Sequence, residues 1–236
     1  MGFMARFAPA RRWAMVAALT AAVAVLSIGC SNEPSAASEL SGPRFLAAAF
    51  TPSSVVLGHE VVIDVLTWEV TDVAWRGCSV AWVGTADGLE CPIEAFELGE
   101  GLPLVLTPED EMFLLAEDIS GGETTAHPMV VRLDEGGPDA HLNVTGVVDS
   151  DGAQLTTVET EAELEMHATV DVEVSSGGVT TFFASAGAFA PWRAAGTETS
   201  TFIAPEEPGA VTIIAVVRET DGAVGWTTTT LTVVAP

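Results

Sequence analysis

Apolar and polar residues alternate along much of this chain, the pattern typical of half-buried β-strands. The most regular run covers residues 158–174, with nine mostly apolar residues on one face and eight polar, mainly acidic, residues on the other. Seventeen extended residues would measure about 56 Å, far longer than an ordinary strand. We therefore expect a kink in this run, or a change from one sheet to another partway along it.

Shorter β-branched runs lie on both sides of this segment, separated by turn-forming Gly, Pro and Asp residues. Asp221-Gly222 supplies the positive-φ positions that a tight hairpin needs between residues 209–218 and the terminal Thr/Val run. The pattern predicts an all-β protein. The other predicted strands are 45–50, 55–57, 61–68, 73–78, 102–106, 112–116, 129–133 and 142–148.

Residues 135–139 (EGGPD) form the strongest turn-rich break within the β pattern. They divide it into a first predicted β domain, residues 44–135, and a second, residues 139–236. Each is about the size of one small sandwich domain. We therefore expect two domains.

The first 30 residues have a different pattern. Three arginines (Arg6, Arg11 and Arg12) precede an apolar run, residues 13–28, which is followed by Gly29-Cys30. This order is typical of an export signal. Sixteen apolar residues are fewer than the ~20 that a membrane-spanning helix needs, which disfavours an uncleaved anchor.

Residues 26–30 (LSIGC) resemble the lipobox of bacterial lipoproteins, although Ser27 stands where leucine is usual. The resemblance implies cleavage of residues 1–29, attachment of a diacylglyceryl group to Cys30 and, often, acylation of the new amino end. A plain cleaved signal with an incidental cysteine is the alternative. Residues 30–43 are small and polar, so we expect a lipidated tether that spans about 20 Å as a flexible coil.

The charge of the mature part excludes one class of partner. After residue 29 the chain has 33 acidic residues and only five arginines, and it has no lysine, so its net charge is −28. Such a body would be repelled by phosphate backbones and anionic headgroups, so we expect no nucleic-acid binding. Since 48% of all residues are hydrophobic, packed cores are nevertheless expected.

Cys78 and Cys91 remain as a pair once Cys30 is assigned to the lipid. In an exported protein they predict a disulfide that closes a 14-residue loop, worth about 3 kcal/mol in the chain-entropy model. A two-thiolate metal site is the alternative, and no further cysteine or histidine lies near enough in the sequence to support it.

Two stretches carry a family resemblance. Residues 45–91 have an N-terminal strand, a proline, a glycine turn, a valine-rich strand and a strand with Trp75 and Cys78. Residues 165–234 have a Ser-x-Gly-x-Phe corner at 185–189, an Ala204-Pro205 strand end and the Asp221-Gly222 hairpin. Both resemble bacterial Ig-like domains, the second also PKD/cadherin-like ones. The resemblance implies two β-sandwiches that bind or space and have no fixed activity.

Catalytic patterns are weak. His59-Glu60 begins like a zinc-protease motif but has no second histidine, and no Gly-x-Ser-x-Gly elbow occurs. The four histidines, His59, His127, His141 and His167, are scattered. We therefore expect no enzyme, with a hydrolase whose site is assembled from loops as the less favoured alternative.

Calcium is the one cofactor that the composition suggests. Asp149 and Asp151 match the opening of an EF-hand-like loop, and cadherin-like repeats hold Ca²⁺ at domain junctions. However, Ala153 and Thr160 occupy positions five and twelve of such a loop, and neither is a carboxylate. An Asp/Gly turn between strands is the favoured interpretation.

Together these features predict a non-catalytic, lipid-anchored protein of the cell envelope, on either the periplasmic or the surface side of the outer membrane. Ser31 follows the cysteine where retention in the inner membrane would favour Asp. The expected role is adhesion, binding or spacing, with a protein or surface glycan as partner. The alternative is a periplasm-facing accessory subunit of an envelope complex.

Overall fold

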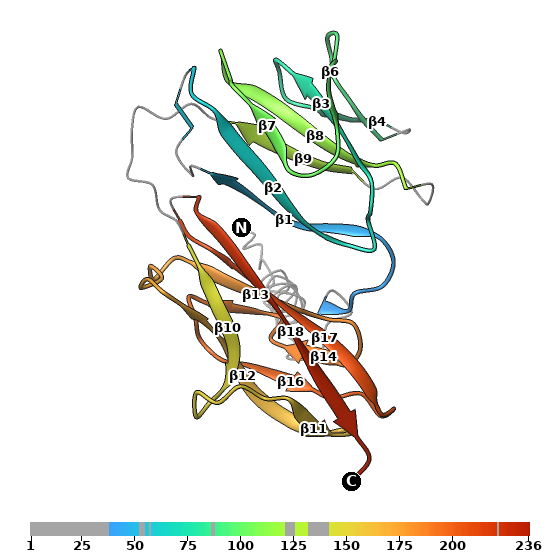
Figure 1. The fold of residues 1–236 in the computed structure, drawn as a ribbon, viewed down its shortest axis with the longest axis vertical. Helices are drawn as coiled ribbons and strands as arrows, with labels where there is room; N and C mark the ends of the chain where they lie inside the picture. The colour runs from blue at the N-terminus through green and yellow to red at the C-terminus, as the bar shows by residue number, and fades with distance from the viewer. Residues whose placement is uncertain are drawn as a thin grey trace, which may run out of the picture. The chain divides into compact units, whose positions relative to one another are not determined.

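The computed structural model describes residues 38–51, 55–56, 58–85, 88–120, 126–131, 142–220 and 222–236. The chain divides into two compact units, residues 1–33 and 34–236, and the described residues all lie in the second. They form eighteen β-strands (Figure 1). The described part of the chain has no helix long and apolar enough to cross a membrane. The prediction of an all-β protein is confirmed.

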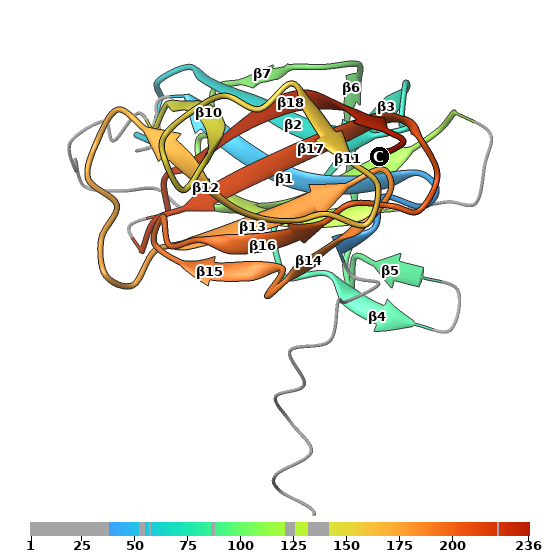
Figure 2. The same cartoon turned by 90° about the horizontal axis from the view of Figure 1, so that it is seen from below.

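The first sandwich packs a three-stranded sheet, in the order β1-β2-β7, against a four-stranded sheet, in the order β6-β3-β8-β9. A separate two-stranded hairpin, β4-β5, stands apart from both sheets (Figure 2). The strands are β1 (Arg44–Thr51), β2 (Val61–Trp68), β3 (Val73–Cys78), β4 (Val83–Thr85), β5 (Gly88–Glu90), β6 (Phe96–Glu100), β7 (Leu104–Leu106), β8 (Met112–Asp118) and β9 (Ala126–Val131).

Period-2 alternation builds the core of this sandwich. Val61, Ile63 and Val65 point inward from β2, and Trp75 of β3 is fully buried beside them. The indole Nε1–H of Trp75 donates a hydrogen bond to the carbonyl of Gly101 at 2.8 Å. The one polar atom of this large side chain is therefore satisfied inside the core.

The second sandwich has a four-stranded sheet, in the order β10-β12-β16-β14, and a five-stranded sheet, in the order β11-β18-β17-β13-β15. Three phenylalanines, Phe182, Phe189 and Phe202, stack at its centre with ring centroids 5.0 and 5.1 Å apart. The strands are β10 (Val144–Asp149), β11 (Thr157–Glu159), β12 (Glu163–Val170), β13 (Val179–Ala184), β14 (Ala188–Ala190), β15 (Arg193–Ala195), β16 (Ser200–Ile203), β17 (Gly209–Arg218) and β18 (Val224–Val234).

The long alternating run of the second sandwich changes sheets, as its length predicts. Its first part, β11, pairs in parallel with β18, whereas β12 pairs antiparallel with β10 and β16 in the opposite sheet. The break falls at Glu161, whose φ of 59° is left-handed. β11 lies beside β18, the last strand of the chain, within the same five-stranded sheet. With two packed sheets in each half of the described chain, the predicted fold class of Ig-like β-sandwich domains is confirmed.

The remaining strand predictions differ in accuracy. The predicted strands at 61–68, 73–78 and 209–218 coincide with β2, β3 and β17. Around 55–57, only Val55 forms an isolated bridge, and residue 57 lies outside the described residues. Five strands were not predicted from the sequence: β4, β5, β6, β13 and β15. The predicted domain break at 135–139 also lies outside the described residues.

The predicted tether (residues 30–43) differs from the structure at its far end. Residues 30–37 are outside the described residues, but Ser38 and Leu40 are buried, with 0% and 5% of their surface exposed. Leu40 belongs to a third apolar cluster with Leu46, Ala47, Phe183, Ile214 and Val216. The chain therefore contacts the second sandwich before it enters β1 of the first.

Candidate binding surface on the disulfide-closed loop

The predicted disulfide is present. Cys78 at the end of β3 is bonded to Cys91, with an S–S distance of 2.01 Å and Cα atoms 5.9 Å apart. Both cysteines are buried. The bond closes residues 79–90, which include the β4-β5 hairpin, and so fixes the base of a loop that lies outside the two sheets.

A second contact holds this loop against the sheet. The indole Nε1–H of Trp82 donates to the carbonyl of Phe113 on β8 at 3.3 Å. The Arg76 guanidinium lies 5.4 Å from the centre of the Trp82 ring and pairs with Glu117 on the neighbouring strand at 3.4 Å. Because a partly exposed cation–π contact is worth about 0.5–1 kcal/mol, it adds modestly to the disulfide.

Large apolar side chains are exposed on this loop and just after it. The exposed fractions are 39% for Val80, 50% for Val83, 54% for Ile93 and 39% for Phe96. We call these four residues the loop face. Single exposed apolar residues are ordinary, but several on one short, fixed segment are typical of interaction sites.

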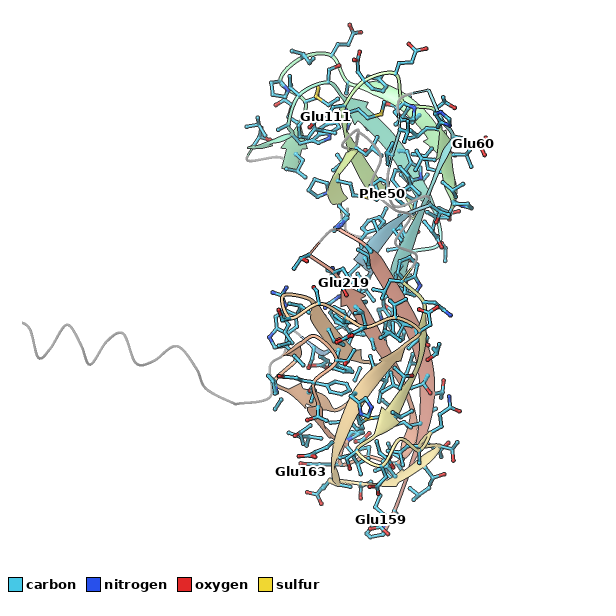
Figure 3. All side chains as sticks on the ribbon, turned by 90° about the vertical axis from the view of Figure 1, so that its left-hand side faces the viewer. Phe50, Glu60, Glu111, Glu159, Glu163 and Glu219 are labelled. Carbon is cyan, nitrogen blue, oxygen red and sulfur yellow. A yellow bond between two sulfur atoms is a disulfide. The ribbon has the colours of Figure 1, made fainter. Side chains whose placement is uncertain are left out.

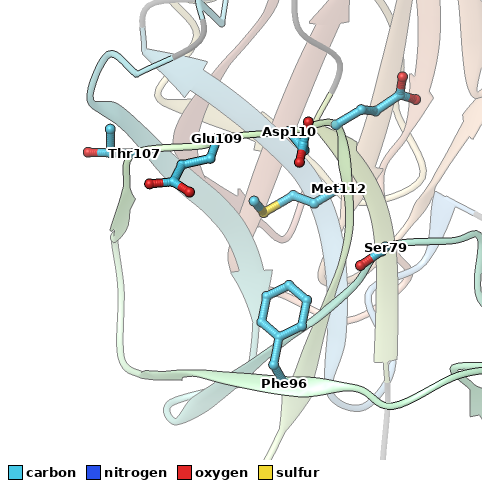
Figure 4. A pocket seen from close by; sticks show the side chains of 7 residues that line it. Ser79, Phe96, Thr107, Glu109, Asp110 and Met112 are labelled. Atoms are coloured by element: carbon cyan, nitrogen blue, oxygen red, sulfur yellow. The ribbon is translucent and has the colours of Figure 1, made fainter.

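A pocket of about 520 Å³ adjoins the loop face and shares Phe96 with it. Phe96 and Met112 project into the same space from different segments (Figure 4). Phe96 lies over Gly77, where an added Cβ would come within 2.2 Å of its Cε2 atom. Glycine at this position therefore makes room for the ring. The other lining residues are Ser79, Thr107, Glu109, Asp110 and Glu111.

Carboxylates surround this apolar surface. The pocket contributes three, and Glu90, Glu94 and Glu97 are exposed along the loop and β6. Acidic side chains are also spread over the surfaces of both sandwiches (Figure 3). Of the arginines on described strands of the first sandwich, Arg44 donates to Glu39 and Ser41 and Arg76 pairs with glutamates. The surface therefore has a negative potential that attracts cationic groups.

Of the two suggested calcium residues, Asp149 is the last residue of β10 and Asp151 lies in the turn that follows. The Asp149 Oδ1 atom accepts hydrogen bonds from the N–H groups of Asp151 at 3.0 Å and Ala153 at 2.8 Å. Its role in the structure is therefore that of a turn-stabilising acceptor. Across the described ranges, no three or more His, Cys, Asp or Glu residues come together in a way that could hold a metal ion.

The histidines are on separate elements. His59 is exposed in a loop, His127 is half-buried on β9 and His167 is half-buried on β12. His127 stacks on Phe45, with ring centroids 6.1 Å apart, and burial together with the nearby charge of Arg218 lowers its pKa. His141 and the lipidation candidate Cys30 lie outside the described residues.

The disulfide could be predicted from the sequence, but the surface next to it was not. Val80 and Val83 lie in a short apolar run with Ala81 and Trp82, which by itself does not show whether the residues are buried or exposed, and Ile93 stands between Pro92 and Glu94. Phe96 was missed because β6 was not predicted. The useful signal was the excess of apolar residues within a loop bounded by two cysteines.

Comparisons with known proteins place no family name on this chain. No protein-family model matches it, and no curated protein does. Three similar solved structures span most of the chain. Fibronectin(III)-like modules of Clostridium thermocellum CbhA match with a TM-score of 0.30 and 13% identity, over 80% of this chain and 94% of theirs.

The other two structures are a glucan utilization locus protein and a chimeric titin fragment. The Bacteroides ovatus mixed-linkage glucan utilization locus protein SGBP-B, in complex with a heptasaccharide, matches with a TM-score of 0.25 and 12% identity, over 83% of this chain and 48% of that one. A chimeric titin Z1Z2 matches with a TM-score of 0.25 and 16% identity, over 82% of this chain and 98% of that one. At such scores these likenesses carry no functional argument, and the fold assignment rests on the strand topology.

Proposed function

We propose that this chain is an exported, non-catalytic binding module, anchored to the cell envelope through lipid on Cys30. Its loop face and the adjoining pocket bind a partner protein that presents basic side chains around an apolar contact. The observation that carries the binding part is the set of exposed apolar residues, held by the Cys78–Cys91 disulfide within acidic surroundings.

The chemistry of the pocket supports recognition. Its lining offers carboxylates, two hydroxyl groups, a phenyl ring and a thioether. Carboxylates can accept hydrogen bonds from Lys or Arg, while Phe96 and Met112 provide a contact for an aliphatic stem. Because the partner's cations would meet several carboxylates, binding should weaken with rising salt concentration.

The anchoring part rests on the sequence. Arginines, an apolar run and the LSIGC motif stand in the order of a lipoprotein signal. Two or three acyl chains, at about 0.8 kcal/mol per buried methylene, anchor a protein stably where one chain does not. The highly acidic body would add no attraction to anionic lipids, so the acyl chains have to supply the membrane affinity.

Protease treatment of intact cells tests localisation, with Cys30→Ala as the anchoring control. We expect the wild-type body to be clipped from whole cells, and Cys30→Ala to abolish its membrane fraction. A variant that stays in the membrane fraction without Cys30 would contradict lipid anchoring. Protection until the outer membrane is opened would contradict surface display and favour the second candidate.

That second candidate is a periplasm-facing accessory subunit of an envelope complex. The exposed loop face is the observation that favours it, because an apolar surface of this kind also suits a permanent subunit contact. The two candidates share the binding surface and differ in the side of the membrane on which the partner lies.

A further inference from the structure

The first described residues of the chain are attached to the second sandwich. The buried Ser38 Oγ accepts a hydrogen bond from the N–H of Phe189 on β14 at 3.2 Å. Glu39 forms a parallel bridge with Ala184 at the end of β13, and the N–H of Leu40 donates to the Ala184 carbonyl at 2.8 Å. The Ser38 side chain and the Leu40 backbone are therefore both hydrogen-bonded to partners about 150 residues later in the chain.

Apolar packing and a turn strengthen this attachment. Leu40 packs in the third apolar cluster, which contains Phe183 and Val216 of the second sandwich together with Leu46 and Ala47 of β1. After it, the chain turns through Gly42, whose φ is 71°. Arg44 then holds the turn by donating to the Ser41 carbonyl at 2.7 Å and the Glu39 carbonyl at 3.1 Å. Only beyond this turn does β1 enter the first sandwich.

The position of this attachment limits how far the second sandwich can lie from a lipid on Cys30. Ser38 follows Cys30 by eight residues, which span at most about 26–29 Å when fully extended. Without the attachment, the first fixed residue would be Arg44, and fourteen residues would span up to about 46–50 Å. The attachment therefore shortens the possible reach by nearly half.

We propose that the second sandwich, although later in the chain, is the membrane-proximal one. Residues 38–40 are fixed to β13 and β14 of the second sandwich before the chain reaches β1 of the first, so along the chain the second sandwich is the first one attached after Cys30. This inference rests on the proposed lipidation of Cys30. It assigns the anchoring role to the second sandwich and the binding role to the first, which carries the loop face.

Energy transfer to an acceptor-labelled lipid tests this order in the full-length lipidated protein on neutral phospholipid vesicles. One dye is placed at Glu206→Cys, on the exposed loop after Pro205, which lies beside Gly187 at the start of β14. The other is placed at Thr85→Cys, on the exposed β4. The native cysteines are lipidated or disulfide-bonded, so each variant has a single free thiol.

We expect higher transfer from position 206 than from position 85. A Gly/Ser insertion of about 20 residues after Ser31 roughly doubles the root-mean-square reach and should lower the transfer from position 206. Leu40→Asp, which places a charge in the apolar cluster, should lower it as well. Equal transfer from both positions, or higher transfer from position 85, would overturn the inference while leaving lipid anchoring intact.

Hydrogen exchange tests the attachment without any lipid. In a soluble body starting at Ser31, the amides of Leu40 and Phe189 should exchange slowly. The substitution Leu40→Asp should accelerate exchange of the amide at position 40. Exchange of the Leu40 amide at the rate of an unstructured peptide would overturn the inference. Loss of the wild-type protein from vesicles would instead contradict the proposed lipidation, and with it the membrane order, even if both amides remain protected.

Discussion

The two sandwiches share an architecture but differ in what they do with their apolar residues. The second buries three stacked phenylalanines at its centre, and its exposed large apolar residues are only Val172 and Val234 among those described. The first sandwich carries most of the exposed large apolar residues of the described chain, and four of them form the loop face. The proposed function therefore assigns partner contact to the first sandwich, which leaves apolar side chains exposed beside a disulfide-fixed loop, and a supporting role to the second, which buries its aromatic residues.

The largest loss of stability is expected for a substitution in the aromatic core of the second sandwich. Phe189→Ala removes the middle ring of the phenylalanine stack, which is fully buried, and should lower the free energy of unfolding of the second sandwich by about 3–5 kcal/mol. Urea denaturation of the soluble body, followed by circular dichroism, measures this. Phe96→Ala on the loop face is the matched control, and a similar loss there would contradict the difference between the two sandwiches.

Removing the disulfide should act on the first sandwich alone. Because it closes a 14-residue loop, Cys78→Ser with Cys91→Ser should cost about 3 kcal/mol of its free energy of unfolding in the chain-entropy model. The unfolding transition of the second sandwich should not move. Urea denaturation of the double variant and the wild type measures the unfolding transition of each sandwich. A shift of both transitions by the same amount would contradict an effect confined to the first sandwich.

A smaller effect is expected at the position beneath Phe96. In Gly77→Ala the new methyl group would overlap the ring, and because Phe96 is partly exposed the ring should swing outward. The cost should be about 1 kcal/mol or less, the low end of what overpacking causes. Adding Phe96→Ala should remove this cost, which a double-mutant cycle measures. An unchanged cost in the double variant would show that the ring is not the obstacle.

The smallest effect is a pH dependence from His127. Burial and Arg218 lower its pKa in the folded protein, so the unfolded chain binds the proton at higher pH. The contribution to stability is complete above the ordinary pKa of 6.5 and is lost as the pH falls below it. His127→Gln should flatten the dependence of stability on pH between pH 7.5 and 5.5, which urea denaturation at a series of pH values measures. Equal slopes in wild type and His127→Gln would contradict this assignment.

Much of the fold could be predicted because its main strands are rich in apolar and β-branched residues at regular positions. β2, β3 and β17 place an apolar residue at nearly every second position, and the excessive length of the run at 158–174 indicated its change of sheet. β6 (FELGE) has two glutamates and a glycine, and it forms because β3 offers a partner from Ala74 to Gly77. Pairing of that kind depends on tertiary structure rather than on local propensity.

The candidate site was predictable only in part, for a related reason. The cysteine pair could be inferred from export and from the assignment of Cys30, but the exposure of Val83 and Ile93 depends on which sheets cover the loop. Likewise, the small polar residues around Ser38 are typical of a tether. Their attachment depends on Ala184 and Phe189, which lie far away in the sequence. Lipidation of Cys30 stays a prediction.

Photo-crosslinking in living cells tests the binding surface most directly. A photoreactive residue replaces Ile93 on the loop face or, as the control, the exposed Val234 of the second sandwich. We predict a discrete adduct from position 93 that is lost when Glu109 and Glu111 are both changed to Lys, and no such adduct from position 234. The same adducts from both positions, or an adduct at 93 that survives the charge reversal, would contradict a binding surface made of the loop face and its acidic pocket.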